Sequence, residues 1–228
     1  MNISVFDVIG PVMIGPSSSH TAGAARLSKV ARNIVAKPFS HVSFGLHGSF
    51  AKTYKGHGTD CALVAGILGF DEDDERLADA FSIAKERGIT FEFYEIDIEG
   101  MHENTVMMTF FLDDNSKCVV TGSSIGGAQI IIRKINYFEV EFTAQSSTLI
   151  IQQLDRKGVI SEVSKKLAQH NINIGIMKLS RTAKGEKALW IIETDDNISN
   201  DLVNEIQNIN NILSVKAINV ESSEDKNV

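Results

Sequence analysis

Residues 148–180, TLIIQQLDRKGVISEVSKKLAQHNINIGIMKLS, join an apolar strand pattern to an amphipathic helix pattern and then to a second strand pattern. The helix pattern covers about residues 159–170 and places Ile160, Val163 and Leu167 on one side. The order then repeats: a strand over 187–194, a helix that begins at 195–199, and a strand over 213–220. This part of the chain is therefore predicted to have the order βαββαβ.

A βαββαβ order is typical of a ferredoxin-like sandwich, in which two helices cover one face of a four-stranded antiparallel sheet. The other face must also be covered, so we expect dimerisation or docking there. The polar stretch at residues 143–147 predicts the boundary with the preceding domain. We place a C-terminal domain at residues 148–222 and a tail at 223–228.

The preceding residues, 1–143, predict a second, mixed α/β domain. Apolar residues at helical spacing predict helices over 27–35, from about 59, and over 77–84. Short apolar or alternating stretches predict strands at 3–9, 42–46, 89–96, 105–112, 118–121, 128–133 and 139–142. The predicted fold class of the whole chain is therefore α+β.

Composition limits the kinds of partner. The formal net charge is −7 and no basic stripe is present, which argues against nucleic acid. Only two cysteines occur, and they are not closely spaced, so a reduced cytoplasmic location is expected rather than a secreted disulfide framework. No apolar run approaches the roughly 20 residues that span a bilayer, and the first residues do not form a basic and apolar leader, so no membrane association is expected.

The densest polar cluster, GPSSSHTAG at residues 15–23, directly precedes a predicted helix. Free backbone N–H groups at a helix start favour an anion such as a carboxylate. Hydroxyls add donors, and His20 can titrate near neutral pH. The alternative is that the loop only caps the helix through Ser19 or Thr21.

Two further loops have similar character. In residues 56–60, GHGTD, glycines flank His57, and Asp60 either orients that histidine or occupies the first turn of a helix. Residues 121–127, TGSSIGG, lie between two predicted strands and could form only a turn or bulge. The three loops together would suit a small substrate whose carboxylate needs several donors. The sequence contains no Cys-x-x-Cys motif and no pair of histidines at i,i+4 spacing, so it does not predict a metal site.

The motif at residues 15–23 closely resembles the serine-binding motif of the iron–sulfur-dependent L-serine dehydratases. Residues 46–60, LHGSFAKTYKGHGTD, resemble a second signature of that family, and residues 124–127, SIGG, are similar to a third, although Ala128 stands where a further glycine is common. The resemblance covers the whole chain and is to the β subunit of the two-subunit bacterial form. It implies a role in amino-acid catabolism and gluconeogenesis.

The resemblance implies conversion of L-serine to pyruvate and ammonia, with a [4Fe-4S] cluster whose ligands lie on an α subunit. His20 and His57 are the candidate catalytic residues, without an assignment of acid or base. The candidate substrate-binding residues are Ser17, Ser18, Ser19, Thr21, Gly58, Thr59, Asp60, Ser124, Gly126 and Gly127. The alternative is a non-catalytic amino-acid sensor whose N-terminal domain is an allosteric serine site.

The C-terminal domain resembles an ACT domain, a small module that senses amino acids. Its marks are the segment DRKGV at 155–159 and the segment NINI at 171–174. The resemblance implies an effector site that includes Asp155, Gly158 and Asn173, with Gln153 as a possible addition, and homo-oligomer contacts through this domain. Many such domains bind nothing, so a pure assembly role is equally open.

Overall fold

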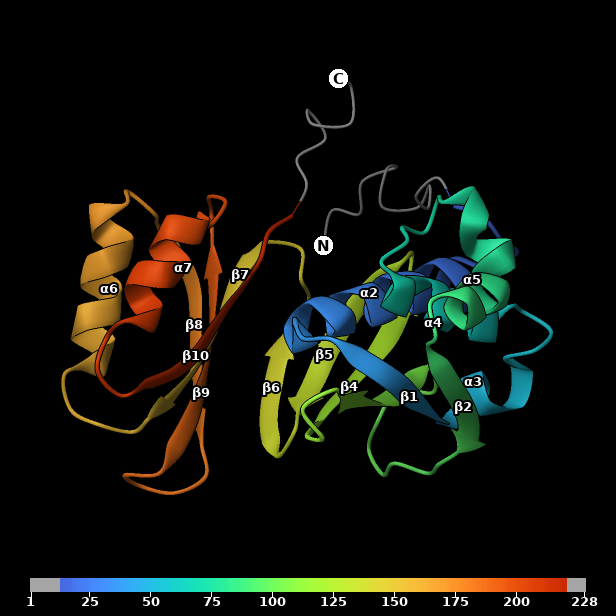
Figure 1. The fold of residues 1–228 in the computed structure, drawn as a ribbon, viewed down its shortest axis with the longest axis horizontal. Coiled ribbons are helices and arrows are strands. Elements are labelled where there is room, and N and C mark those ends of the chain that lie inside the picture. The colour runs from blue at the N-terminus through green and yellow to red at the C-terminus, as the bar shows by residue number, and fades with distance from the viewer. Residues whose placement is uncertain (1–12, 221–228) are drawn as a thin grey trace. The chain divides into compact units, whose positions relative to one another are not determined.

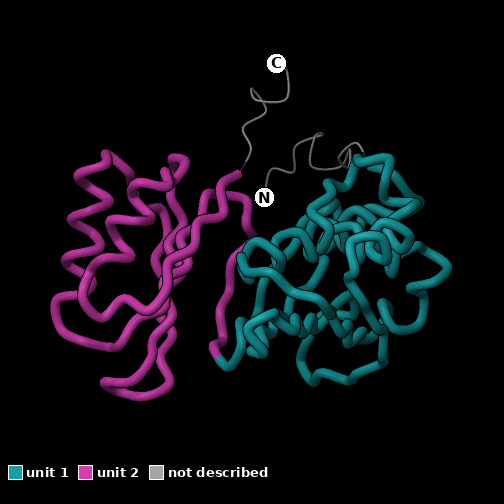
Figure 2. The backbone as a smooth tube through the Cα atoms, viewed as in Figure 1, with its two compact units in different colours: residues 1–137 teal, residues 138–228 magenta. Residues whose placement is uncertain are grey.

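The computed structural model describes residues 13–220 of the 228-residue chain. The predicted strand at residues 3–9 and the predicted tail at 223–228 lie outside the described residues. The chain divides into two compact units, residues 1–137 and residues 138–228 (Figure 2). This division falls earlier than residue 143, where the sequence places the end of the first domain.

The first unit is built on a sheet with the strand order β2-β1-β3-β4-β5. Its strands are β1 (Phe39–Leu46), β2 (Thr90–Glu95), β3 (Thr105–Leu112), β4 (Lys117–Gly126) and β5 (Gln129–Ile135). β1 pairs with β2 in parallel, and the other pairs are antiparallel. Residues 42–46 are all buried rather than alternately exposed, because β1 is an inner strand of this sheet.

The helices of the first unit include a tightly packed pair, α2 (Gly23–Val35) and α4 (Thr59–Leu68). A Cβ at Gly66 would collide with the Ser28 hydroxyl and the Ala25 carbonyl, so this glycine allows the close approach. The predicted apolar face of α2 is buried, with Leu27 and Ile34 almost fully inaccessible. Burial of each such side chain contributes about 1.5–3 kcal/mol.

Three short helices complete this unit: α3 (Gly48–Thr53), η2 (Glu75–Asp79) and α5 (Ala80–Glu86). α3 lies where the sequence predicts only a glycine-rich loop. The single helix predicted over 77–84 is divided between η2, a 3₁₀ helix, and α5. Phe81, predicted on its apolar face, keeps 36% of its surface exposed.

The second unit contains the predicted βαββαβ order, so the α+β fold class is confirmed. After β6 (Phe138–Phe142), the elements are β7 (Ser147–Leu154), α6 (Val159–Gln169), β8 (Ile174–Arg181), β9 (Lys187–Thr194), α7 (Asn200–Gln207) and β10 (Ile212–Ile218). The sheet is antiparallel, with the order β10-β7-β9-β8. α6 and α7 lie beside each other against one face (Figure 1). A core that includes Ile151, Trp190 and Leu202 fills the space between.

Candidate functional site

The first motif forms a short π-helical turn, η1 (Ser18–Ala22), which leads directly into α2. Ser17 precedes it in extended conformation, and its hydroxyl accepts a hydrogen bond from the His20 backbone N–H at 3.1 Å. Ser17 is therefore the capping residue, and the prediction of Ser19 or Thr21 in that role is wrong. The cap fixes the backbone at the residue that carries the candidate catalytic imidazole.

The His20 imidazole is held at both ring nitrogens. Nδ1 lies 3.0 Å from Ser19 Oγ, and Nε2 lies 3.0 Å from Ser49 Oγ. The His20 ring also packs edge-to-face against the ring of the buried Phe50, with their centroids 5.3 Å apart. Burial, and to a smaller extent the neighbouring His57, hold the pKa of His20 below its usual value of 6.5. The ring is therefore neutral at neutral pH.

The second motif brings His57 to His20. Their ring centroids are 4.9 Å apart, and Thr21 Oγ1 donates to the His57 backbone carbonyl at 2.9 Å. His20 is partly buried, whereas His57 is exposed. Among the described residues, the His57 ring makes no hydrogen bond. The two candidate catalytic residues thus meet in one place, with one ring fixed and the other accessible.

Gly58 and Asp60 have local roles at the start of α4. Gly58 has a φ of 66°, which places it in the left-handed region that favours glycine at the residue before the helix. Asp60 Oδ1 accepts a hydrogen bond from the Cys61 backbone N–H at 2.9 Å. Of the two possibilities for Asp60, the geometry favours occupation of the first turn over orientation of His57.

The third motif lies largely within β4, so its prediction as a loop after residue 121 is wrong. Gly126 and Gly127 make the turn into β5, with φ values of 99° and 58°. Ala128 follows with a φ of 58°, and its backbone N–H donates to the Ser18 carbonyl at 3.1 Å. The turn is therefore joined to the first motif, and the position where glycine is common has a backbone conformation that suits glycine.

Two buried hydroxyls in the motifs have no hydrogen-bond partner among the described residues: Thr59 Oγ1 and Ser124 Oγ. Both residues have none of their surface exposed. Ser124 packs against α2, where a Cβ at Gly23 would collide with its hydroxyl. An unpaired buried hydroxyl costs about 1–3 kcal/mol, so a ligand that supplied a partner would recover that free energy.

Ser49 contacts His20 but was not among the predicted site residues, although it lies within the segment 46–60 that resembles the second signature. Its place in that segment was the only feature of the sequence that could have marked it as a site residue. Asn104 was also missed: it is buried, and its carbonyl accepts from the Ser124 N–H at 3.0 Å. The remaining histidines bind backbone or neighbouring side chains; they are His41, His47, His102 and His170.

In the second unit, the four candidate effector residues do not all converge. Gln153 is buried in β7, and Gly158 precedes α6 with a φ of 93°. Asp155 accepts from the Gly185 N–H and from Arg181, both at 3.1 Å, and the first of these contacts is the larger cause of its lowered pKa.

Asn173 lies at the opposite end of the sheet. Its amide donates to Asp195 Oδ2 at 2.6 Å beside the end of β9, whereas Leu154 pairs with Lys187 at the start of β9. The eight residues of β9 separate these ends by roughly 25 Å. One copy of the chain therefore does not bring Asn173 to Asp155.

Comparison with known proteins places the chain in a family. A family model described as "Serine dehydratase beta chain" matches residues 4–90. The "Probable L-serine dehydratase, beta chain" of Bacillus subtilis (strain 168) is 43% identical over 215 residues, which are 94% of this chain and 97% of that protein. This chain belongs to the L-serine dehydratase beta chain family. A second member, the "L-serine dehydratase, beta chain" of Peptoniphilus asaccharolyticus, is 38% identical over 95% of this chain and 98% of that protein.

The L-serine dehydratase beta chain family is not the only group with similar sequences. A family model described as "ACT domain" matches residues 147–211, which confirms the predicted identity of the βαββαβ segment. The "D-3-phosphoglycerate dehydrogenase" of Bacillus subtilis is 29% identical over 198 residues, which are 86% of this chain but 37% of that protein. The likeness therefore extends across both units.

Within residues 13–220, no group of three or more His, Cys, Asp or Glu side chains could hold a metal ion. Cys61, in α4, and Cys118, in β4, do not form a disulfide bond. No helix of the described part is both long and apolar enough to cross a membrane.

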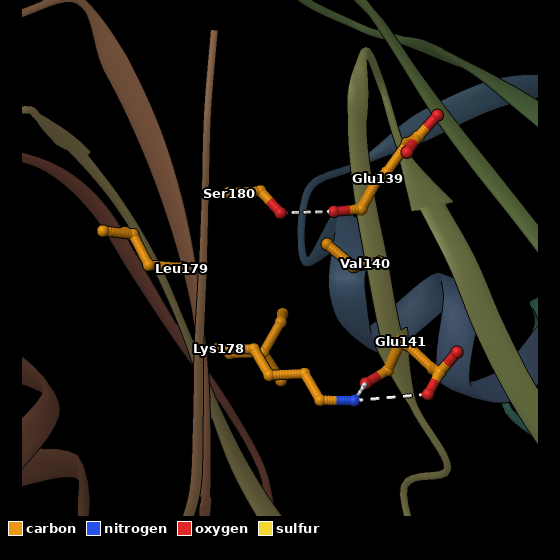
Figure 3. Close-up of a pocket in the computed structure, with 7 residues that line it drawn as sticks. Glu139, Val140, Glu141, Lys178, Leu179 and Ser180 are labelled. Atoms are coloured by element: carbon orange, nitrogen blue, oxygen red, sulfur yellow. Dashed lines mark hydrogen bonds and ion pairs between the residues drawn. The ribbon is translucent and has the colours of Figure 1, made fainter. Parts of the chain in front are cut away.

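Two hollows lie away from the histidine pair. One of about 380 Å³ is lined by β6 and β8, where Lys178 Nζ donates to the Glu141 carbonyl and carboxylate and Ser180 donates to the Glu139 carbonyl (Figure 3). The other, of about 160 Å³, lies beside Tyr54 and Phe93. None of the candidate site residues lines either hollow. In the second unit, β6 therefore covers part of the sheet face that α6 and α7 leave open.

Proposed function

We propose that this chain is the β subunit of an iron–sulfur L-serine dehydratase, which converts L-serine to pyruvate and ammonia together with an α subunit. The observation that carries the proposal is the meeting of His20 and His57, from two separate motifs, at 4.9 Å between ring centroids. Membership of the L-serine dehydratase beta chain family supplies the substrate. A cytoplasmic location fits this metabolic role and two cysteines that form no disulfide bond.

Substrate binding falls to the hydroxyls and backbone groups around the two histidines. The Thr59 and Ser124 hydroxyls each lack a partner, but both residues are fully buried, so a substrate carboxylate can accept from them only if the surrounding loops open on binding. The first motif adds the hydroxyls of Ser18 and Ser19 on a π-helical turn. Serine is small and doubly charged, so several short-range donors fit it better than a large apolar pocket.

The reaction is an elimination followed by hydrolysis. A base removes the proton on Cα, the bond from Cβ to the hydroxyl oxygen breaks, and the oxygen leaves as water after protonation. The resulting 2-aminoacrylate tautomerises to an imine, and water converts the imine to pyruvate and ammonia. We assign the proton acceptor to His57, because its ring is exposed and makes no hydrogen bond among the described residues. His20 remains neutral and fixed beside it.

The [4Fe-4S] cluster does not fit the described residues of this chain. Such clusters are held by several cysteine thiolates, and among the described residues neither Cys61 nor Cys118 belongs to a group of three candidate ligands. We therefore assign the cluster and its ligands to the α subunit. The burial of Cys61, followed by the charge of Asp60, raises the pKa of that thiol, which disfavours the thiolate form that a metal requires.

The alternative is an allosteric serine site, with all chemistry on the α subunit. The likeness to D-3-phosphoglycerate dehydrogenase, which extends across both units, favours this candidate. The two roles differ in their kinetics. Loss of an allosteric site shifts the serine concentration at half-saturation, whereas loss of a proton acceptor lowers the turnover number.

The test is anaerobic purification of this chain with a co-expressed candidate α subunit, followed by measurement of pyruvate formed from L-serine. We expect activity only in the cluster-containing complex. His57→Asn, in the intact complex, should lower kcat by at least about 10²-fold. A change in half-saturation with an unchanged kcat would support the allosteric site instead, and serine binding by a chain that recruits no α subunit would support a sensor.

For the ACT unit, we propose an effector site that forms between two copies of the chain. Asp155 and Asn173 lie at opposite ends of the sheet, so a site that uses both side chains needs a second copy. Their present partners, Arg181 and Asp195, would have to exchange for the ligand. Equilibrium dialysis with labelled L-serine, on wild-type chain and on Asn173→Ala, measures whether this unit binds the amino acid.

A further inference from the structure

Serine hydroxyls surround the His20 backbone and ring. The Ser17 hydroxyl oxygen accepts from the His20 backbone N–H, so its own proton is available to another acceptor. The next hydroxyl, Ser19 Oγ, lies 3.4 Å away. Ser19 Oγ in turn lies 3.0 Å from His20 Nδ1. These contacts join Ser17, Ser19 and the imidazole in one chain. Donation from Ser17 to Ser19 and from Ser19 to Nδ1 is one of the two directions that satisfy every group.

The direction of this chain and the tautomer of the ring determine each other, so the partner at Nε2 can select both. A neutral imidazole has one donor and one acceptor nitrogen, and burial keeps His20 neutral at neutral pH. If Nδ1 accepts from Ser19, the proton must lie on Nε2. Nε2 then donates to Ser49 Oγ at 3.0 Å. No other hydrogen bond of Ser49 Oγ occurs within the described part of the chain.

Ser49 is held firmly enough for this role. It is the second residue of α3, and the Phe50 N–H donates to the Glu103 carbonyl at 3.3 Å. Gly48 has a φ of 58° and lies against Glu103, where a Cβ would collide with the backbone. The adjacent Phe50 is fully buried and packs against the His20 ring. The position of the Ser49 hydroxyl is therefore fixed by backbone contacts on both sides.

We propose that Ser49 is a positioning residue. Its hydroxyl oxygen accepts a hydrogen bond from His20 Nε2–H and so holds the ring in the Nε2–H tautomer. The hydroxyl proton of Ser49 then remains available to donate. The consequence for catalysis rests on the proposed dehydratase function. A ring fixed in orientation and tautomer keeps the same donor and acceptor nitrogens beside His57 and the substrate. The structural part of the proposal does not depend on that function.

The structural part is tested by NMR of the full-length chain labelled with ¹⁵N-histidine, with the His20 signals assigned by their loss in His20→Gln. The expected spectrum shows the Nε2–H tautomer in the wild type and in Ser49→Thr, which keeps the hydroxyl. Ser49→Ala should give a mixture of tautomers. A wild-type ring protonated at Nδ1, or a His20 spectrum unchanged in Ser49→Ala, would overturn the proposal.

The catalytic part is tested in the assembled complex. Ser49→Ala should lower kcat by about 10- to 100-fold with KM nearly unchanged, and Ser49→Thr should restore most of the rate. The matched control is Thr53→Val, one turn along α3, because Thr53 Oγ1 donates to the Ser49 carbonyl and not to His20.

An equal loss in Thr53→Val would show that α3 integrity, rather than the Ser49 hydroxyl, controls the rate, and would overturn the proposal. If the wild-type complex forms no pyruvate from L-serine, the dehydratase function fails. The tautomer measured by NMR still decides the role of Ser49 in that case.

Discussion

At the scale of single residues, His20 combines a partly buried polar ring with a lowered pKa. Its surroundings favour the neutral form, first through burial and then through the nearby His57. A neutral ring can donate from one nitrogen and accept at the other, which is the arrangement that two flanking serines require. Protonation would make both ring nitrogens donors, so neither could accept from a serine hydroxyl.

This environment makes a prediction for stability against pH. Between its folded pKa and its unfolded value near 6.5, His20 binds more protons in the unfolded chain, so its contribution to the free energy of unfolding rises with pH in that window. As pH falls below about 6.5, the wild type should lose stability relative to His20→Asn. Urea unfolding of both proteins at pH 7.5 and 5.5 measures this difference. A stability difference that is the same at both pH values would contradict the lowered pKa.

Ala128 shows how a departure from a family pattern is accommodated at one residue. A left-handed conformation costs a residue other than glycine roughly 1–2 kcal/mol, and Ala128 has a φ of 58°. Its N–H donates to Ser18, and its side chain is almost completely buried. Alanine therefore keeps the link between the third and first motifs, at some cost in backbone strain.

At the scale of secondary structure, α7 depends on a clear N-terminal cap. The Ser199 hydroxyl accepts from the Leu202 N–H at 3.2 Å. Ser199→Ala should lower the free energy of unfolding by about 1 kcal/mol, whereas Ser199→Asp, which keeps an acceptor, should change it little. Thermal or urea unfolding followed by circular dichroism measures both. Equal losses in the two variants would show that the hydrogen bond is not the stabilising contact.

The elements also show what could and could not be predicted from sequence. The βαββαβ order was predictable because its strands and helices carry apolar residues at regular spacing, as in α6 with Val163 and Leu167 buried. α3 was not, because its six residues, GSFAKT, bury only Phe50 and are too short for a periodic pattern. The extent of β4 was missed because Gly122, Ser123 and Ser124 resemble a loop by composition.

The candidate site divides in the same way. The histidines could be named from their motifs, but their contact could not be deduced because it depends on how two segments fold together. Ser49 lies 29 residues from His20 in sequence, and no local pattern links them. Likewise, the separation of Asn173 from Asp155 follows from strand directions that only the folded sheet reveals.

At the scale of the whole molecule, each unit has its own buried core, and the sequence contains one tryptophan. Trp190 is fully buried in the second unit, so its fluorescence reports on that unit alone. Leu202→Ala, in the same core, should destabilise the unit by about 2–5 kcal/mol and lower the fluorescence midpoint in urea. Leu63→Ala, in the first unit, should shift the circular dichroism transition and leave the fluorescence transition in place. Equal shifts of both signals in both variants would show that the two units unfold as one.

The close approach of Gly23 to Ser124 has a consequence for protein engineering. Any side chain at position 23 would occupy the space of the Ser124 hydroxyl, although the two positions lie in different motifs. A library that randomises the first motif alone would therefore lose almost every replacement of Gly23, whatever its chemistry. Libraries that explore the proposed substrate-binding motifs should vary positions 23 and 124 together, since a smaller residue at 124 creates the room that a larger one at 23 needs.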